Sequence, residues 1–188
     1  MGGVMSSIVV SGDTSGAITI AAPAVSGTNT LTLPASTGTL LTTGSPQSGG
    51  IIQVVQATFA GLISSASATL TDTGLTASIT PKFATSKILV LVNMNCCGKT
   101  ANTNADFQLL RGATSIFKMG DIVGYTNSTL PINIGSVDGV YLDSPATTSS
   151  TTYKTKYANV LATGAVYMNF YYNNDTTTSS ITLLEVAA

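Results

Sequence analysis

The sequence predicts an all-β protein, with an extended N-terminal arm of short strands followed by a jelly-roll-like β-sandwich of about eight strands. Short apolar or alternating runs separated by Gly, Pro, Ser and Asn fill the 188 residues, without helical i, i+3, i+4, i+7 periodicity. Thr, Ser and Asn replace most of the usual Lys and Glu, which favours strands and turns over helix. A hydrophobic content of 44% suffices for a core in a chain of this length.

Residues 1–46 form the predicted arm, an attachment and trimerisation segment. Three short units, at 17–20, 31–34 and 38–41, alternate apolar residues with Thr and are bounded by Gly, Pro or Asn. Strands this short are marginal on their own in water, so we expect them to dock on another chain. The candidate interface residues are Ile18, Ile20, Leu31, Leu33, Leu40 and Leu41.

Charged residues are few and unevenly placed. They make up 8% of the chain, against roughly 25% in ordinary soluble domains. Asp13 is the only charge in residues 1–71. A free surface normally carries charges of both signs, so another chain is expected to cover the first third. The net charge of −1 favours neither nucleic acid nor an anionic membrane as a partner, and no run of about 18 apolar residues predicts a membrane span.

The sandwich is predicted over residues 47–188, after a Gly- and Ser-rich linker at 44–50. The run at 87–95 is apolar enough for the centre of a sheet, and Arg111-Gly112 marks a hairpin. The predicted strands are 51–59, 66–80 (with 72–74 as a candidate break), 87–95, 105–110, 114–117, 130–142, 152–160, 166–172 and 180–186. Such regularly spaced short strands are typical of a sandwich or jelly roll.

We expect no catalytic residue, cofactor or metal. Histidine is absent, which removes the usual general base and transition-metal ligand. Cys96 and Cys97 are adjacent, a poor geometry for a mutual disulfide, and are interpreted as free thiols with one buried. Residues 97–100 (CGKT) mimic the end of a phosphate-binding loop, but Asn93 stands where that motif needs Gly. We interpret this segment as a hairpin loop.

Two further groups of residues are of a type that can carry chemistry or recognition. The carboxylates Asp106, Asp121, Asp138, Asp143, Asp175 and Glu185 are candidates for glycoside cleavage, but most lie beside turn-forming residues. Tyrosines crowd the C-terminal third, and Tyr167, Tyr171 and Tyr172 form a candidate recognition surface for sugar rings or a partner protein. The alternative for these tyrosines is ordinary half-buried sandwich faces.

Residues 11–43 (SGDTSGAITIAAPAVSGTNTLTLPASTGTLLTT) resemble a segment of tail-fibre and virion-surface proteins of tailed bacteriophages. The later pieces SKILVLVNMN, FQLLRGATSI, YLDSPATTSSTTYK and SSITLLEV resemble the β-sandwich module that follows that segment. The resemblance covers most of the chain and is one of pattern, without a catalytic signature. It implies a homotrimeric, non-enzymatic virion structural protein. The chain departs from the fibre pattern because no long shaft separates the arm from the sandwich.

Two functions follow from this reading. In the first, the protein is a capsid decoration or cement protein whose arm clamps the head surface, with the major capsid protein as its partner. In the second, it is a short tail fibre or spike whose sandwich recognises the host surface, where a glycan is a candidate ligand. Both place the protein on the virion surface after synthesis in the bacterial cytoplasm. The absence of a shaft favours the first.

Overall fold

The computed structural model describes residues 7–12, 14–21, 25, 28, 30, 35, 42, 44, 46–100, 102–127, 129–170 and 177–188. The chain divides into two compact units, Met1–Leu40 and Leu41–Ala188. Within the described residues the fold is all-β, with twelve strands in three antiparallel sheets and no helix. No helix long and apolar enough to cross a membrane is therefore found in this part of the chain.

The strands are β1 (Ser7–Ser11), β2 (Ala17–Ala21), β3 (Ile51–Phe59), β4 (Ile63–Ser65), β5 (Thr71–Ile79), β6 (Lys87–Lys99), β7 (Ala105–Arg111), β8 (Thr114–Val123), β9 (Ile132–Asp143), β10 (Thr151–Asn159), β11 (Val166–Met168) and β12 (Ser179–Val186). The predicted all-β class is confirmed. The predicted strands at 31–34 and 38–41 lie outside the described residues, apart from the ends of their flanking turns.

The first unit contains a two-stranded antiparallel hairpin of β1 and β2. Val10 lies opposite Ile18, and Ile8 lies opposite Ile20. Strand β2 was predicted, whereas β1 was not. The run Ile8-Val9-Val10 is rich in β-branched residues, a signal that would have identified β1.

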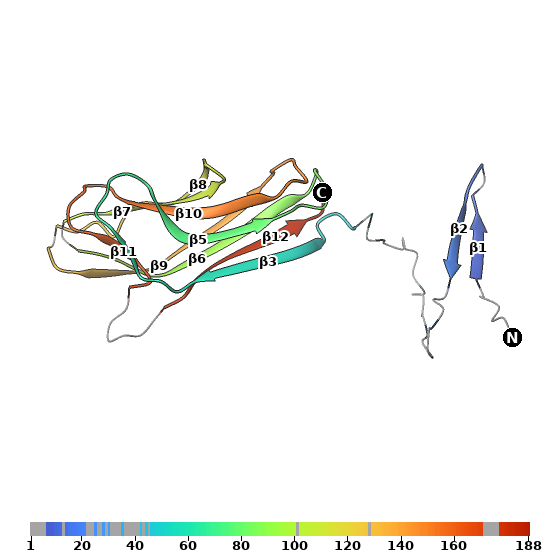
Figure 1. Ribbon diagram of the computed structural model, residues 1–188, viewed down its shortest axis with the longest axis horizontal. Coiled ribbons are helices and arrows are strands. Elements are labelled where there is room, and N and C mark those ends of the chain that lie inside the picture. The colour runs from blue at the N-terminus through green and yellow to red at the C-terminus, as the bar shows by residue number, and fades with distance from the viewer. Residues whose placement is uncertain are drawn as a thin grey trace. The chain divides into compact units, whose positions relative to one another are not determined.

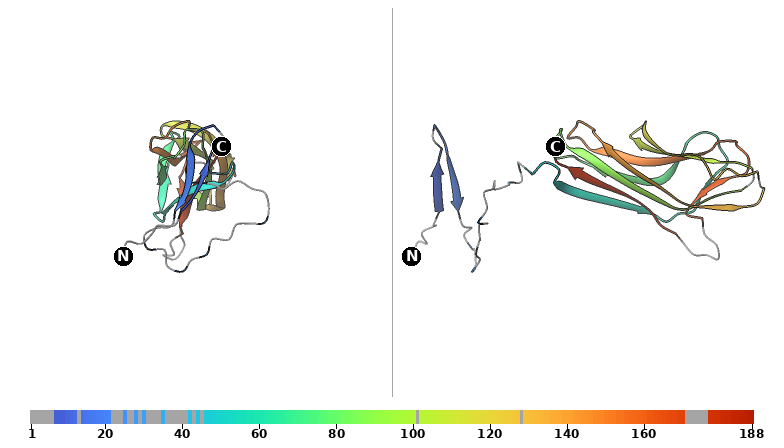
Figure 2. Two further views of the ribbon diagram at one scale, coloured as in Figure 1. Left: turned by 90° about the vertical axis from the view of Figure 1, so that its right-hand side faces the viewer. Right: turned by 180° about the vertical axis from the view of Figure 1, so that it is seen from behind.

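The second unit is a β-sandwich of two sheets (Figure 1). One sheet has the strand order β5-β10-β7-β8; the other has the order β3-β12-β6-β11-β4, with β9 on the opposite edge of β6. Strand β6 is central, as predicted, because β12 and β11 pair along one side of it and β9 pairs along the other. The C-terminus lies at the end of the sandwich where β3 begins (Figure 2), and Ala187 exchanges backbone hydrogen bonds with Gly49 and Gly50.

The core lies between the two sheets, and buried residues alternate with outward ones along β12, most of β5 and the first eight residues of β6. In β6, Ile88, Val90, Val92 and Met94 are buried while their neighbours point outward. Successive side chains of a strand point to opposite faces of the sheet, so a sheet with one face on the core buries every second residue. The other buried side chains of the core are Leu75, Ala77, Ile79, Cys97, Ala105, Phe107, Leu109, Val137, Tyr153, Tyr157, Val166, Met168, Ile181 and Leu183.

The structure corrects several strand predictions; β8, for example, runs to Val123 rather than ending at residue 117. Residues 97–99 are not a hairpin loop: they continue β6, and Gly98 and Lys99 pair with Asn133 and Ile132 of β9. The apolar pattern of the sequence stops near Cys96, but the strand does not. A bulge at Cys96, whose φ is +45°, shifts the register, and pairing with β9 continues beyond it.

Strand β5 begins at Thr71, so the predicted strand at 66–80 is five residues too long at its start. It then runs through the candidate break at 72–74, where Gly74 has φ +83° and the register with β10 shifts. Strand β11 ends at Met168 rather than at residue 172.

Candidate functional site

The hairpin of the first unit holds the predicted interface residues that the structure describes. Ile18 and Ile20 lie on one face of β2, and their cross-strand partners Val10 and Ile8 share that face because directly opposite residues point the same way. The exposed fractions are 70% for Ile18, 48% for Ile20, 56% for Val10 and 66% for Ile8. We call these four side chains the hairpin face. Val9, on the other side, is also exposed.

The structure therefore places Ile18 and Ile20 on one face. Val10 and Ile8, which the sequence prediction missed, lie on the same face. Leu31, Leu33, Leu40 and Leu41 lie outside the described residues, so their place in the interface stays a prediction.

The predicted recognition surface reduces to Tyr167 among the described residues. Tyr167 lies in β11 opposite Ser64 and Gly98, and its ring packs at 5.2 Å between centroids against Phe170, tilted by 51°. Tyr171 and Tyr172 lie outside the described part. Tyr167 and Phe170 are half-buried, a state that leaves part of each ring open to contact.

Other tyrosines of the C-terminal third belong to the core. Tyr153 and Tyr157 are fully buried, and the ring of Tyr157 stacks on that of Phe107. Burial raises the pKa of Tyr157 to about 12. Burial also raises the pKa of Tyr153 strongly, reinforced by the hydrogen bond that its hydroxyl donates to Asp143. These phenols serve packing and interior hydrogen bonding.

The two cysteines are free thiols, as predicted, and Cys97 is the buried one. Its Sγ donates to the backbone oxygen of Met94 at 3.5 Å. Burial raises the pKa of the Cys97 thiol to about 12, so the thiolate that a nucleophile requires is disfavoured at neutral pH.

The lysine of the CGKT segment is turned into the molecule. Lys99 is 1% exposed, and its Nζ donates a 2.6 Å hydrogen bond to Oγ1 of Thr126 in the β8–β9 loop. Phosphate-binding loops present their lysine at the start of a helix, whereas Lys99 ends a strand inside a sheet. This lysine is placed to join the end of β6 to the β8–β9 loop.

The described candidate carboxylates all have local partners. Asp121 pairs with Lys118 at 3.0 Å, Asp106 lies 3.8 Å from the same amine, and Asp143 pairs with Arg111 at 2.8 Å. Asp138 accepts a hydrogen bond from Asn93. Asp175 lies outside the described residues. Within the described part, no group of three or more His, Cys, Asp or Glu side chains could hold a metal ion.

Glu185 is fully buried and serves a structural purpose. Its carboxylate accepts hydrogen bonds from Nε2 of Gln53 at 2.5 Å and from the backbone amides of Lys82 at 2.7 Å and Phe83 at 3.3 Å. Burial by itself raises the pKa of this carboxyl, but these hydrogen bonds outweigh it and the pKa is lowered. Glu185 thus ties the β5–β6 loop to β12 and β3.

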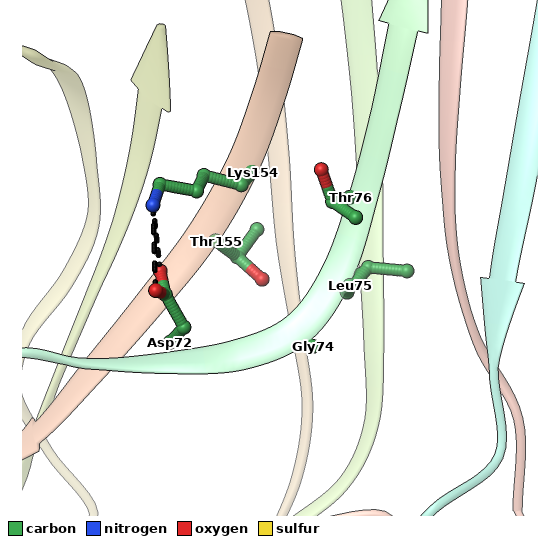
Figure 3. Close-up of a pocket in the computed structure, with 6 residues that line it drawn as sticks. All are labelled: Asp72, Gly74, Leu75, Thr76, Lys154 and Thr155. Carbon is green, nitrogen blue, oxygen red and sulfur yellow. Dashed lines mark hydrogen bonds and ion pairs between the residues drawn. The ribbon is translucent and has the colours of Figure 1, made fainter. Parts of the chain in front are cut away.

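A cavity of about 250 Å³ lies over the bulge between β5 and β10. It is lined by Asp72, Gly74, Leu75, Thr76, Lys154 and Thr155 (Figure 3). Asp72 and Lys154 point toward each other across it and pair at 3.1 Å, while Leu75 points away from them. Lys156 lies 3.9 Å from the same carboxylate. The charged groups of this cavity are thus already paired with each other.

No protein-family model matches the chain, and no curated protein matches it. One similar solved structure is a subviral particle of infectious bursal disease virus VP2, with 13% sequence identity and a TM-score of 0.33. The match covers 72% of this chain but only 41% of that one. The assignment to tailed bacteriophages stays a prediction.

Proposed function

We propose that the protein is a non-enzymatic structural component of a virus particle, a homotrimeric decoration or cement protein that clamps the capsid through its N-terminal arm. The observation that carries this proposal is the hairpin face. Four β-branched side chains of a two-stranded hairpin are about half exposed or more, with no charged side chain among them. Such a hairpin gains stability by packing against another chain.

The gain from covering the hairpin face is large enough for attachment. Full burial of a Val or Ile side chain contributes roughly 1.5–3 kcal/mol, so covering the exposed half of four of them contributes on the order of 3–6 kcal/mol per copy. Ordering the arm offsets part of this gain. Three copies held together attach through three arms at once, which multiplies the effective strength of attachment.

The residues with reactive side chains support a structural role. The Cys97 thiol is buried with a raised pKa, Lys99 is bonded to Thr126, and Glu185 is bonded to Gln53 and two backbone amides. Each group is engaged in interactions that stabilise the fold. Catalysis instead needs acids, bases or nucleophiles within reach of a substrate.

Deletion of residues 1–44 tests the role of the arm. The second unit has its own core, so the truncated chain is expected to stay folded while losing its binding to particles. Particles that lack the protein should lose resistance to heat or low salt and still adsorb to cells. Truncated protein that binds particles as tightly as the full chain would contradict the proposal.

The alternative, a short tail fibre or spike, is favoured by two observations on the sandwich. Tyr167 and Phe170 present a tilted, partly open aromatic pair, and a separate cavity in the other sheet is lined by the Asp72–Lys154 ion pair. Aromatic rings and paired polar groups are the elements of a sugar-binding surface. Under this alternative, particles lacking the protein are robust but fail to adsorb.

A further inference from the structure

One sheet of the sandwich has an apolar outer face. In the sheet containing β3, β12, β6 and β9, the side chains that alternate with the core residues point away from the core. Six of them are Val54, Leu89, Leu91, Val140, Leu142 and Leu184, which we call the apolar face. Val140 is 64% exposed, Val54 57%, Leu142 50% and Leu91 37%.

These side chains form continuous rows across the sheet. Val54 lies opposite Leu184, Leu184 opposite Leu89, and Leu89 opposite Leu142, so one row of four apolar residues crosses all four strands. The next row holds Gln56, Thr182, Leu91 and Val140 in the same register. Opposite side chains on neighbouring strands lie about 5 Å apart, so each row is contiguous.

The outer face of the other sheet is different, since it carries most of the described ion pairs. Lys154 and Lys156 of β10 pair with Asp72 of β5, and Lys118 of β8 pairs with Asp121 and Asp106. One broad face of the sandwich is therefore charged, while the other carries the apolar face in its middle and charges only at its ends. This asymmetry indicates that the apolar face is covered in the assembled protein.

The outer surface of this sheet is large enough for contact with another protein surface. The apolar face occupies two of its four outward rows; with strands about 4.8 Å apart and rows about 7 Å apart, the four rows together give an area on the order of 500 Å² per copy. Two such faces together bury about 1,000 Å², the lower limit of a specific interface. An anionic membrane is a poorer match, because the outward rows contain one cation, Lys87.

The charges at the ends of the face identify the occupant. Lys87 ends the face on one side, opposite Val186, and Asp138 ends it on the other, opposite Asn93. No charged side chain lies in the outward rows between them. If two copies of this face are laid together with their strands reversed, the Lys87 end of each copy lies over the Asp138 end of the other. The face is thus self-complementary in both polarity and charge.

We propose that the apolar face packs against the same face of a second copy, related by a two-fold axis that runs across the strands. This inference rests on one part of the proposed function, namely that the protein assembles with copies of itself. In the proposed trimer, which the arms hold together, this contact joins two trimers back to back and gives six chains. Packed sheets lie about 10 Å apart, so the rows of Leu89 and Leu91 interleave with those of the second copy.

Sedimentation equilibrium of the full chain tests the pairing. The double variant Leu91→Lys/Val140→Lys places two cations on the face, at exposed positions that do not contact the core. We expect its assembly mass to be half that of the unsubstituted chain at tens of micromolar. The matched control Thr76→Lys/Thr114→Lys, at exposed positions in the charged sheet, should keep the full mass. Circular dichroism and the urea midpoint confirm that both variants are folded.

The outcomes separate this inference from the proposed trimer. Six chains falling to three supports both. Two chains falling to one supports the face and contradicts the trimer. An unchanged mass in a folded Leu91→Lys/Val140→Lys variant overturns the face, and the trimer stands if that mass is three times the chain mass.

Charge reversal tests the two-fold arrangement. Lys87 and Asp138 are about 20 Å apart within one chain, twice the screening length at 0.1 M salt, so they couple only through a second copy. Lys87→Glu should weaken pairing several-fold, and Lys87→Glu/Asp138→Lys should restore it. A double reversal that pairs no better than the single one overturns the arrangement.

Discussion

The hydroxyl of Tyr153 donates a 2.6 Å hydrogen bond to Oδ2 of Asp143 and so links the two sheets of the sandwich through its interior. Tyr153 belongs to β10 in the four-stranded sheet, and Asp143 is the last residue of β9 in the other sheet. Nη1 of Arg111 in β7 lies 2.9 Å and 2.8 Å from the two carboxylate oxygens. The carboxylate thus has partners in two strands of the facing sheet.

Substitution of Asp143 should lower stability by a large amount. Asp143→Ala removes a nearly buried carboxylate and leaves both the Tyr153 hydroxyl and the Arg111 guanidinium without it. We expect a loss of about 1–3 kcal/mol in the free energy of unfolding, measured by urea denaturation, because the buried Tyr153 hydroxyl loses its acceptor while Arg111 stays partly open to solvent. Asp121→Ala breaks an exposed pair with Lys118, and its cost should stay below about 1 kcal/mol. Equal costs for the two variants would contradict the interior role of Asp143.

High pH should destabilise the sandwich. The folded-state pKa of Cys97 is raised from 9.0 to about 12 and that of Tyr157 from 10.0 to about 12, because burial disfavours both anions. A group with a raised pKa in the folded state holds its proton longer there than in the unfolded chain. Its contribution is complete below the unfolded pKa and is lost as pH rises toward the folded value.

The free energy of unfolding is therefore expected to fall between pH 9 and pH 12, by about 1.4 kcal/mol per pH unit for each proton involved. Urea denaturation at several pH values measures this slope. Tyr157→Phe should flatten it between pH 10 and pH 12, and Cys97→Ala should flatten it from pH 9. A slope unchanged in both variants would show that these groups do not govern alkaline stability.

Nucleotide and chelator should leave the thermal stability unchanged. Gly98 and Lys99 lie within β6, and the Lys99 amine is bonded to Thr126, so the segment cannot wrap a phosphate without breaking the sheet. A ligand that binds only the folded state must raise the melting temperature. We expect no shift in a thermal melt with ATP and magnesium or with EDTA. A rise of several degrees with ATP would show that the segment binds phosphate.

Much of the fold could be predicted from alternation alone. In β5, Leu75, Ala77 and Ile79 are buried and alternate with the exposed Thr76 and Ser78, as the apolar alternation of this part of the sequence predicts. The same signal failed at the end of β6, because Cys96 to Lys99 break the apolar pattern while backbone pairing with β9 continues through a bulge. Strand ends fixed by pairing with a distant segment leave no local signal.

The two candidate surfaces also differ in whether the sequence could predict them. Ile18 and Ile20 were predicted from a charge-free run of short strands, and the structure places them on an exposed hairpin face. The apolar face could not be predicted, because its rows exist only when the register of β3, β12, β6 and β9 brings together residues that are far apart in the sequence. Val54 and Leu142 are 88 residues apart in sequence and belong to one row only through that register.

The central claim is that this protein assembles with copies of itself through its arm. Light scattering on the full chain with the apolar face blocked by Leu91→Lys/Val140→Lys tests it most directly, because the arm is then the remaining proposed contact. The account predicts three times the chain mass at micromolar concentration, and a monomer when Ile8→Lys and Ile18→Lys are added to the hairpin face. A folded chain that is already a stable monomer before the hairpin face is changed would contradict the claim.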